Sequence, residues 1–468
     1  MAFSSLTFLY FFLPLALLFH YMTKNMVFRN TSLILFSLIF YAWGEPLMVG
    51  LLLISAFFDY GNARLIERFR NAEKMGKAKA VLVFSIIVNL GALVAFKYSG
   101  FLYDNINYLV KLPFPRPEVF MPIGISFYIF RTISYVTDVY RGTVPAQKNP
   151  MKYLLYISLF QLTFMGPIAR YQHLEGELTD RKFDWKDFSS GINRFCLGLF
   201  KKILIANIAA ELMEKYLVDG FSDLTGADAW FGIILFSIYL YFDFSGYSDM
   251  AIGVGRMFGF HIQENFRHPY AAVSVADFYR RWHISLGTFF RDYVYIPLGG
   301  NRKWQDRNIF IVWMLTGLWH GAQWNYVMWG CYFGLLMILE KYSQPVLKVT
   351  PRLFKHLYVL ILIVFSRAIF YFEDFDDLWN FIAHHLFDFS KFSNLGITGD
   401  LISHAYWLGL VILLCIPWNE FSWTSGKFYG FCTKLYYGAS PVLNVGFVFL
   451  TTMMMLGSSF NPFFYQKF

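Results

Sequence analysis

An ionisable side chain, His320, interrupts a long apolar stretch at residues 308–340. Ionisable groups within apolar segments are costly to bury, and they tend to be functional. Imidazole titrates near neutral pH, so this side chain suits general acid or base chemistry. The alternative is a structural histidine that hydrogen-bonds a neighbouring helix and holds it in place. Between the two, the sequence favours a functional role for His320.

A second histidine, His283, follows Arg280, Arg281 and Trp282 in a segment rich in aromatic and basic residues. Guanidinium groups bind the phosphates of an anionic donor well. They also bind lipid phosphates at the surface of a membrane. Arg280, Arg281 and the nearby Arg291 are therefore either donor ligands or membrane anchors. His283 is correspondingly either part of a site or a surface histidine.

Motifs of several other chemistries are missing from the sequence. It has no P-loop, no GxSxG and no HExxH, and its four cysteines lack the spacing of metal ligands. The acids Asp243 and Asp249 do not fit an EF-hand, because the ligand run and the terminal glutamate are missing. We expect these acids to hold arginines of residues 256–307, which is a structural role. We therefore expect no metal and no permanently bound cofactor.

The composition sets the class of protein that must hold these side chains. Of the 468 residues, 57% are hydrophobic and only 15% are charged, whereas a soluble protein carries about 25% charged residues. A soluble enzyme is excluded, because one soluble core cannot hide so much apolar surface. The net charge of +9 fits basic cytoplasmic loops, and no nucleic-acid motif accompanies it. We therefore expect a membrane protein that contacts lipids and binds no nucleic acid.

Apolar segments long enough to enter a membrane recur along the whole chain, since a helical span needs about 20 residues. They are residues 3–21, 31–58, 79–97, 119–139, 152–171, 191–213, 229–251, 308–340, 356–372, 402–418 and 439–458. We expect an all-α polytopic membrane protein with about 10–13 transmembrane or half-spanning helices. Amphipathic helices of residues 256–307 should lie at the membrane interface. No linker divides the chain, so we expect a single domain over residues 1–468, with a catalytic core at about 119–340.

The charges of the loops indicate the topology. Basic residues are concentrated in residues 61–79, 256–307 and 341–355, which we expect in the cytoplasm. The acidic residues 373–401 should face outward. The apolar stretch between two of the basic segments, residues 308–340, must therefore enter the membrane and return on the same side.

That stretch is too short for two full crossings. It makes only about 50 Å of helix, and two crossings need about 60 Å. We expect a hairpin whose turn falls near residues 320–325, at membrane depth. Such a turn is tolerated only where it is buried in protein or lines a wet cavity. A second break is expected in residues 31–58, because Pro46 disfavours a continuous helix there.

Three runs of residues around the two histidines match motifs of a known family. They are residues 277–286 (DFYRRWHISL), 291–301 (RDYVYIPLGGN) and 317–325 (GLWHGAQWN). Further matching runs are residues 40–46 (FYAWGEP), 122–127 (PIGISF), 243–249 (DFSGYSD) and 460–463 (FNPF). The sequence resembles the membrane-bound O-acyltransferase family. Within it, the closest match is to the membrane subunits of bacterial alginate, peptidoglycan and exopolysaccharide O-acetyltransferases. The resemblance implies helices arranged around an intramembrane tunnel.

The resemblance also implies roles for particular residues. His320 falls on the invariant histidine of the family and His283 on its second signature position, so both are implied to be catalytic. The implied substrate-binding residues are Arg280, Arg281, Trp282, Arg291, Trp319 and Asn325. Asn325 is placed to donate to a developing oxyanion or to pack. One departure is Phe333, because alginate relatives commonly carry a histidine there, and this weakens the case for alginate as the product.

The implied activity is transfer of an acetyl group from a cytoplasmic donor, acetyl-coenzyme A. The acetyl group moves toward an extracytoplasmic glycan or a partner acetyltransferase of the SGNH type. The implied location is the cytoplasmic (inner) membrane of a bacterium, which the chain crosses several times. Two alternatives stay open. One is a transporter of an acetylated carrier in which His320 relays protons. The other is a lipid- or protein-acylating member of the same family.

Overall fold

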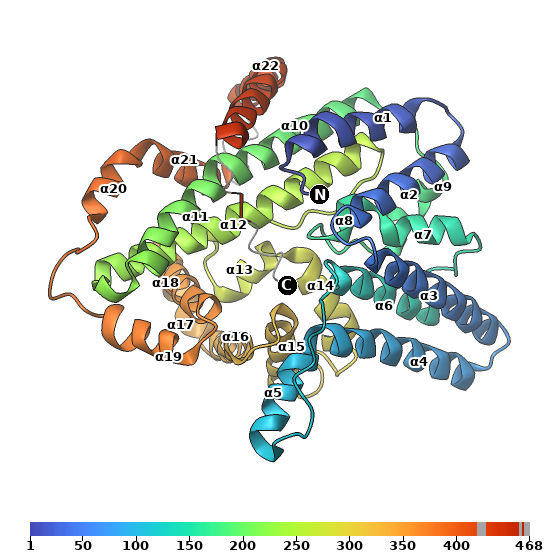
Figure 1. Cartoon of the computed structure of the whole chain (residues 1–468), viewed down its shortest axis with the longest axis horizontal. Coiled ribbons are helices and arrows are strands. Elements are labelled where there is room, and N and C mark those ends of the chain that lie inside the picture. Colours follow the sequence, from blue (N-terminus) through green and yellow to red (C-terminus); the bar gives the residue numbers. More distant parts are fainter. Residues whose placement is uncertain (419–426, 458–460, 463–468) are drawn as a thin grey trace. The chain divides into compact units, whose positions relative to one another are not determined.

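The computed structural model describes residues 1–418, 427–457 and 461–462, and gives side chains for all of these except residues 427–437. Within these ranges every regular element is a helix and no strand occurs (Figure 1). The all-α fold expected from the sequence is confirmed. Of the family-like run at residues 460–463, Phe460 and Phe463 lie outside the described residues.

Five helical stretches of the described chain are long and apolar enough to cross a membrane. They are Met48–Asn71 (α3), Met75–Val110 (α4 to α5), Gly226–Met257 (α12), Arg352–Tyr371 (α18) and Gly438–Gly457 (part of α22). A sixth span results if α20 (Ile397–Ser403) and α21 (Ala405–Cys415), which are bent by 73°, count as one. Two shorter apolar helices, Phe8–Tyr21 and Met26–Ala42, add to these. The polytopic membrane class is thereby confirmed.

The break expected near Pro46 is present. Helix α2 ends at Ala42, and α3 begins at Met48. Between them, the Glu45 carboxylate accepts hydrogen bonds from the backbone N–H of Ile123, at 2.9 and 3.1 Å. This contact gives the buried Glu45 carboxylate a hydrogen-bond donor in the segment between the two helices.

A second break was not expected. Residues 152–171 form not one helix but α7 (Pro150–Ser158) and α8 (Phe160–Thr163). The buried guanidinium of Arg131, on α6 (Ile125–Arg141), donates to the carbonyl oxygens of Tyr156 at 3.0 Å and Ile157 at 2.6 Å. A helix end leaves such carbonyls without helical partners, so Arg131 stabilises the end of α7.

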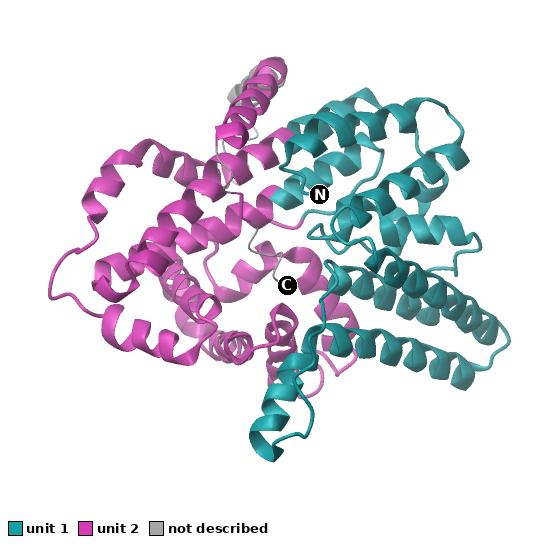
Figure 2. Cartoon of the chain, viewed as in Figure 1, with its two compact units in different colours: residues 1–195, 247–264, 465–468 teal, residues 196–246, 265–464 magenta. Residues whose placement is uncertain are grey.

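Contacts between residues cluster the chain into two compact units (Figure 2). Among the described residues, unit 1 consists of residues 1–195 and 247–264. Its other helices are α1 (Leu13–Tyr21), α4 (Met75–Leu93), α5 (Ser99–Val110), α9 (Tyr171–Thr179) and most of α10 (Trp185–Phe200). Buried Asp59 on α3 accepts from Ser85 Oγ at 2.5 Å and Asn89 Nδ2 at 2.8 Å, which links α3 to α4. The single domain expected from the sequence stays a prediction.

Unit 2 consists of the described residues within 196–246 and 265–462. Beyond α12, its helices up to α18 are α13 (Val275–Arg281), α14 (Ile284–Phe290), α15 (Gln305–His320), α16 (Trp324–Tyr342) and α17 (Gln344–Val349). The short helices α13 and α14 fall in the segment expected to be amphipathic. They are followed by a π-helical turn, η7 (Arg291–Tyr295).

Two acids of α12 have different partners from those expected. Asp243 is fully buried against Lys202, with an Oδ1 to Nζ distance of 2.7 Å. Asp249 pairs with Arg194, at 2.7 Å. The structure thus gives both acids a structural role, but these basic partners precede α12 rather than follow it. The distribution of basic residues along the sequence does not indicate which of them pack against α12, so the partners of the two acids could not be predicted.

Candidate functional site

A helical hairpin carries His320 at its turn. Helix α15 ends at His320, three residues adopt a turn, and α16 begins at Trp324. The hairpin turn expected near residues 320–325 is therefore confirmed. That the turn lies at membrane depth, between two cytoplasmic segments, stays a prediction.

The two helices of the hairpin touch through their backbones. A Cβ atom at Gly317 would collide with the Tyr326 carbonyl, and one at Gly330 would collide with the Trp313 carbonyl. Small residues at such crossings let helices approach closely in membrane proteins. The close approach fixes the end of α15, and with it the backbone of His320.

Aromatic rings enclose the imidazole of His320, which is 3% exposed. Its ring centroid lies 4.8 Å from that of Trp319, 5.1 Å from Trp329 and 5.2 Å from Phe370. Phe370 comes from α18, so three helices contribute to this enclosure. The rings leave little freedom for the imidazole to rotate.

His283 sits between α13 and α14 in a left-handed conformation, with φ of 46°. A non-glycine residue in this region costs of the order of 1 kcal/mol, so its surroundings must hold it. The backbone carbonyl of Asn265 accepts from the N–H of the next residue, Ile284, at 2.9 Å. The side chain of Asn265 holds the imidazole itself.

The hydrogen bond from His283 assigns its tautomer. Asn265 Oδ1 lies 3.1 Å from His283 Nδ1 and also accepts from the backbone N–H and Oγ of Ser285, at 3.2 and 2.9 Å. These donors identify the atom as the amide oxygen, so Nδ1 of His283 carries the proton. Burial lowers the pKa of His283 to about 3, and the ring is neutral. Its Nε2 atom is therefore a hydrogen-bond acceptor, with no protein donor among the described residues.

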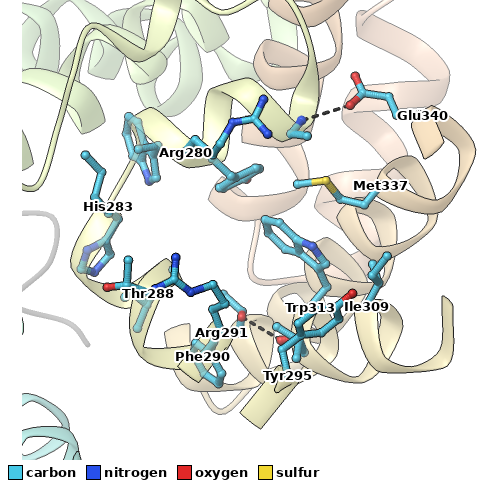
Figure 3. A pocket seen from close by; sticks show the side chains of 18 of the residues that line it. Arg280, His283, Thr288, Phe290, Arg291, Tyr295, Ile309, Trp313, Met337 and Glu340 are labelled. Atoms are coloured by element: carbon cyan, nitrogen blue, oxygen red, sulfur yellow. Dashed lines mark hydrogen bonds between the residues drawn. The ribbon is translucent and has the colours of Figure 1, made fainter. Parts of the chain in front are cut away.

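The two histidines line one cavity of about 810 Å³ within unit 2. Figure 3 shows His283 at the wall of this cavity. Arg280, Trp282 and Arg291 line it as well. The side chains of Arg280 and Arg291 are 71% and 60% exposed, and they pair with Asp277 at 4.0 Å and with Asp292 at 2.7 Å. Both guanidinium groups are therefore open to solvent, although each already has an acidic partner. The structure thus brings together five of the eight residues that the sequence singled out.

The other three residues do not line this cavity. Arg281 pairs with Asp277, at 3.1 Å. Trp319 is buried and does not line the cavity, and its ring centroid lies 5.9 Å from that of His283 and 4.8 Å from that of His320. Asn325 is fully buried and donates from Nδ2 to the Ile369 carbonyl at 3.4 Å. Their predicted roles in substrate binding stay predictions.

Several residues of the site carried little or no signal in the sequence. Asn265, which orients His283, is one of many polar residues outside the apolar segments. Arg367 is 2% exposed and lies over the Trp282 ring at 4.7 Å, so it supports the cavity wall from behind. Its signal was available, because an arginine inside the apolar segment 356–372 is unusual. Glu340 lines the cavity and is buried as well.

Phe333, the position at which the sequence departs from the expected motif, is fully buried in an aromatic cluster. Its ring lies 4.9 Å from Tyr279, 5.4 Å from Trp313 and 5.0 Å from Trp329. All three of these neighbours line the cavity. Phe333 therefore supports the apolar wall from behind and contributes no polar group to the site.

Comparison with known proteins defines the class. Residues 125–375 match the model of MBOAT, the membrane-bound O-acyltransferase family, and the chain belongs to this family of membrane acyltransferases. The matched region contains both histidines and the whole cavity.

The names of similar proteins describe more specific activities than the family name does. The chain is 38% identical to a "Probable alginate O-acetylase AlgI" of Azotobacter vinelandii, over 82% of this chain and 77% of that protein. It is 33% identical to a "Peptidoglycan O-acetyltransferase" of Helicobacter pylori, over 74% and 72% of the two chains. It is 30% identical to a "Teichoic acid D-alanyltransferase" of Bacillus subtilis, over 47% and 59%.

Proposed function

We propose that this protein is an O-acetyltransferase of a bacterial cytoplasmic membrane. It takes an acetyl group from acetyl-coenzyme A on the cytoplasmic side and passes it toward an extracytoplasmic polysaccharide or a partner acetyltransferase. The observation that carries the proposal is that His283 and His320 line the same cavity, which also has exposed arginines at its wall. The names of the relatives support an acetyl group as cargo and a cell-surface glycan as acceptor.

His320 is the general base in this proposal. It accepts the proton of the acceptor hydroxyl while that oxygen attacks the acetyl carbonyl carbon. The tetrahedral intermediate then collapses, the carbon–sulfur bond breaks, and the coenzyme A thiolate leaves and takes up the proton. A positioned base of this kind accelerates such reactions about 10²–10⁴-fold. The thiolate leaves readily, so positioning of the two substrates supplies much of the remaining catalysis.

His283 orients a substrate rather than acting as an acid. Its Nδ1–H is engaged by Asn265, and its neutral Nε2 can only accept a hydrogen bond. A hydroxyl or amide N–H of a bound substrate is the matching donor. His283 therefore holds a substrate group at the end of the cavity, while His320 moves the proton.

The arginines bind the phosphates of the donor. Arg280 and Arg291 come from two different helical segments, and Figure 3 shows both at the cavity wall. Guanidinium groups match phosphate geometry and are suited to this task. A cavity of about 810 Å³ lies within the range of small-molecule sites. Its apolar wall, with Trp313, suits the uncharged arm of the donor.

The decisive experiment uses purified protein in proteoliposomes with radiolabelled acetyl-coenzyme A. Wild-type protein should release coenzyme A and pass label to an added glycan acceptor or a partner acetyltransferase, and His320→Ala should lose this transfer. Full activity of His320→Ala would remove His320 from the mechanism. A transporter would move the carrier without releasing coenzyme A, and a lipid-acylating enzyme would prefer long-chain donors. Mass spectrometry of surface glycans with and without the protein would then name the acceptor.

A further inference from the structure

A buried carboxylate joins the hairpin to the short helix α13. Glu340 lies in the last turn of α16 and is 3% exposed. Its two oxygens accept from the backbone N–H groups of Val275, at 2.5 Å, and Ala276, at 3.0 Å. Figure 3 shows Glu340 beside α13 at the edge of the cavity, with one of these bonds drawn.

The first N–H groups of a helix have no partners within the helix. In α13 they are satisfied from two sources. Ser274 supplies a local cap, because its Oγ accepts from Asp277 N at 2.9 Å. Glu340 supplies the partners of Val275 and Ala276 from a distant part of the chain, and its negative charge also favours the N-terminal end of the helix dipole.

The position of α13 determines where two of the cavity-lining residues lie. Arg280 lies in its last turn, and Trp282 directly follows it. A helix of seven residues is not stable by itself, so contacts with other elements decide where it lies. Glu340 is such a contact, and it lines the same cavity as Arg280 and Trp282.

The end of α16 is itself held by separate contacts. Lys341 Nζ donates to Asp306 Oδ1 and Tyr342 Oη donates to Asp306 Oδ2, both at 2.6 Å. Asp306 is at the start of α15, so these bonds close the open end of the hairpin. Loss of the Glu340 carboxylate therefore releases α13 and leaves the hairpin, with His320, in place.

We infer that Glu340 is a positioning residue, which sets α13 and so places Arg280 for the donor phosphates. This inference rests on the proposed function, because the role of Arg280 toward the donor is part of that proposal. Glu340 touches no reacting atom in it. Its effect should therefore appear in donor binding more than in the chemical step.

The test replaces the carboxylate with an amide of the same shape. Glu340→Gln can accept only one of the two N–H groups, and its own NH₂ opposes the other. In hydrogen exchange of the full-length protein, the amides of Val275 and Ala276 should exchange roughly tenfold faster, as expected for loss of a bond to a charged group. The KM for acetyl-coenzyme A should also rise by roughly tenfold, because donor binding must then supply the free energy of positioning α13 that the lost bond supplied. The change in kcat should be smaller.

Ser274→Ala is the matched control, because it removes the local cap of the same helix and keeps the link to the hairpin. It should speed exchange at Asp277 and leave the donor KM close to that of wild type. The inference is overturned if Glu340→Gln leaves exchange at Val275 and Ala276 unchanged. It is overturned as well if Ser274→Ala raises the donor KM to the same extent.

Arg280→Ala separates the inference from the proposed function. It should raise the donor KM without changing exchange at Val275 and Ala276. If Arg280→Ala leaves the donor KM unchanged while Glu340→Gln still speeds exchange, the donor role of Arg280 is wrong and the link between the hairpin and α13 stands.

Discussion

The indole of Trp319 lies against the imidazole of His283, with the two ring centroids 5.9 Å apart. Trp319 also directly precedes His320, at the end of α15. One buried aromatic ring therefore contacts both histidines, although they come from different helical segments. We predict that this ring acts as a spacer between the two imidazoles.

Trp319→Ala should strongly reduce acetyl transfer, because the cavity left behind lets both histidines shift. A buried Trp→Ala change typically costs about 3–5 kcal/mol of stability, so thermal unfolding should be measured alongside. Trp319→Phe keeps an aromatic spacer and should retain most of the activity. Equal loss of kcat in Trp319→Phe and Trp319→Ala, with normal folding of both, would contradict the spacer role.

Asn265→Asp should make the reaction sensitive to acid. In wild type, burial lowers the pKa of His283 to about 3, so the ring is neutral throughout the usual pH range. A carboxylate beside Nδ1 favours the charged ring and raises its pKa by about 1–3 units. Since the proposed role needs a neutral Nε2, kcat/KM should fall at low pH in the variant, and its acid limb should move to higher pH than in wild type. An unchanged pH profile of kcat/KM would argue against a neutral His283.

Gly330→Ala should destabilise the hairpin and abolish acetyl transfer, because a Cβ there collides with the Trp313 carbonyl. Overpacking of this kind typically costs about 1–3 kcal/mol. Gly409→Ala, in α21, is the matched control, since its added Cβ meets no atom within 4 Å outside its own stretch of helix. The melting temperature of the first variant should fall and that of the second should not. Equal melting temperatures of the two variants would mean that the helices separate easily.

His261 should make a contribution to stability that depends on pH. Its Nδ1 lies 2.6 Å from Glu177 and its Nε2 lies 2.8 Å from Asp187. Partial burial opposes the charged ring, but the hydrogen bonds to Glu177 and Asp187 outweigh it and raise the pKa of His261. The contribution is therefore complete below the unfolded pKa of about 6.5 and is lost as pH rises through the higher folded pKa.

The measurement compares the melting temperatures of wild type and His261→Ala across this pH range. The difference should be largest at pH values below 6.5 and should vanish in alkaline buffer. It should also be small, below about 1 kcal/mol, because the side chain is 56% exposed. A difference that grew with pH would contradict the charged bridge.

The sequence predicted the parts of the fold that depend on composition and on local signals. Loop charge and segment length placed the hairpin turn near His320, and Pro46 marked the break between α2 and α3. The break after Ser158 was not predictable, since its carbonyls are satisfied by Arg131 from another helix. No local sequence pattern predicts a contact between a side chain and the end of another helix.

The site shows the same division. His283 and His320 stand out by residue type and context, and they line the same cavity. Asn265 and Glu340 do not stand out, because their importance comes from contacts with residues distant in the sequence, such as that of Glu340 with Val275. Trp319 was singled out as a ligand, but it does not line the cavity. The sequence could not show this, because the motif does not indicate which way the ring points.

The backbone contact between α15 and α16 makes the two walls of the cavity unequal. On the hairpin side, the helices are in backbone contact at Gly317 and Gly330. The cavity cannot be widened or lengthened there without separating the two helices. On the other side, the wall includes the short helices α13 and α14, whose positions depend on side-chain contacts such as those of Glu340 and Asn265. Attempts to make the enzyme accept a larger acyl group should therefore begin with substitutions in these two short helices.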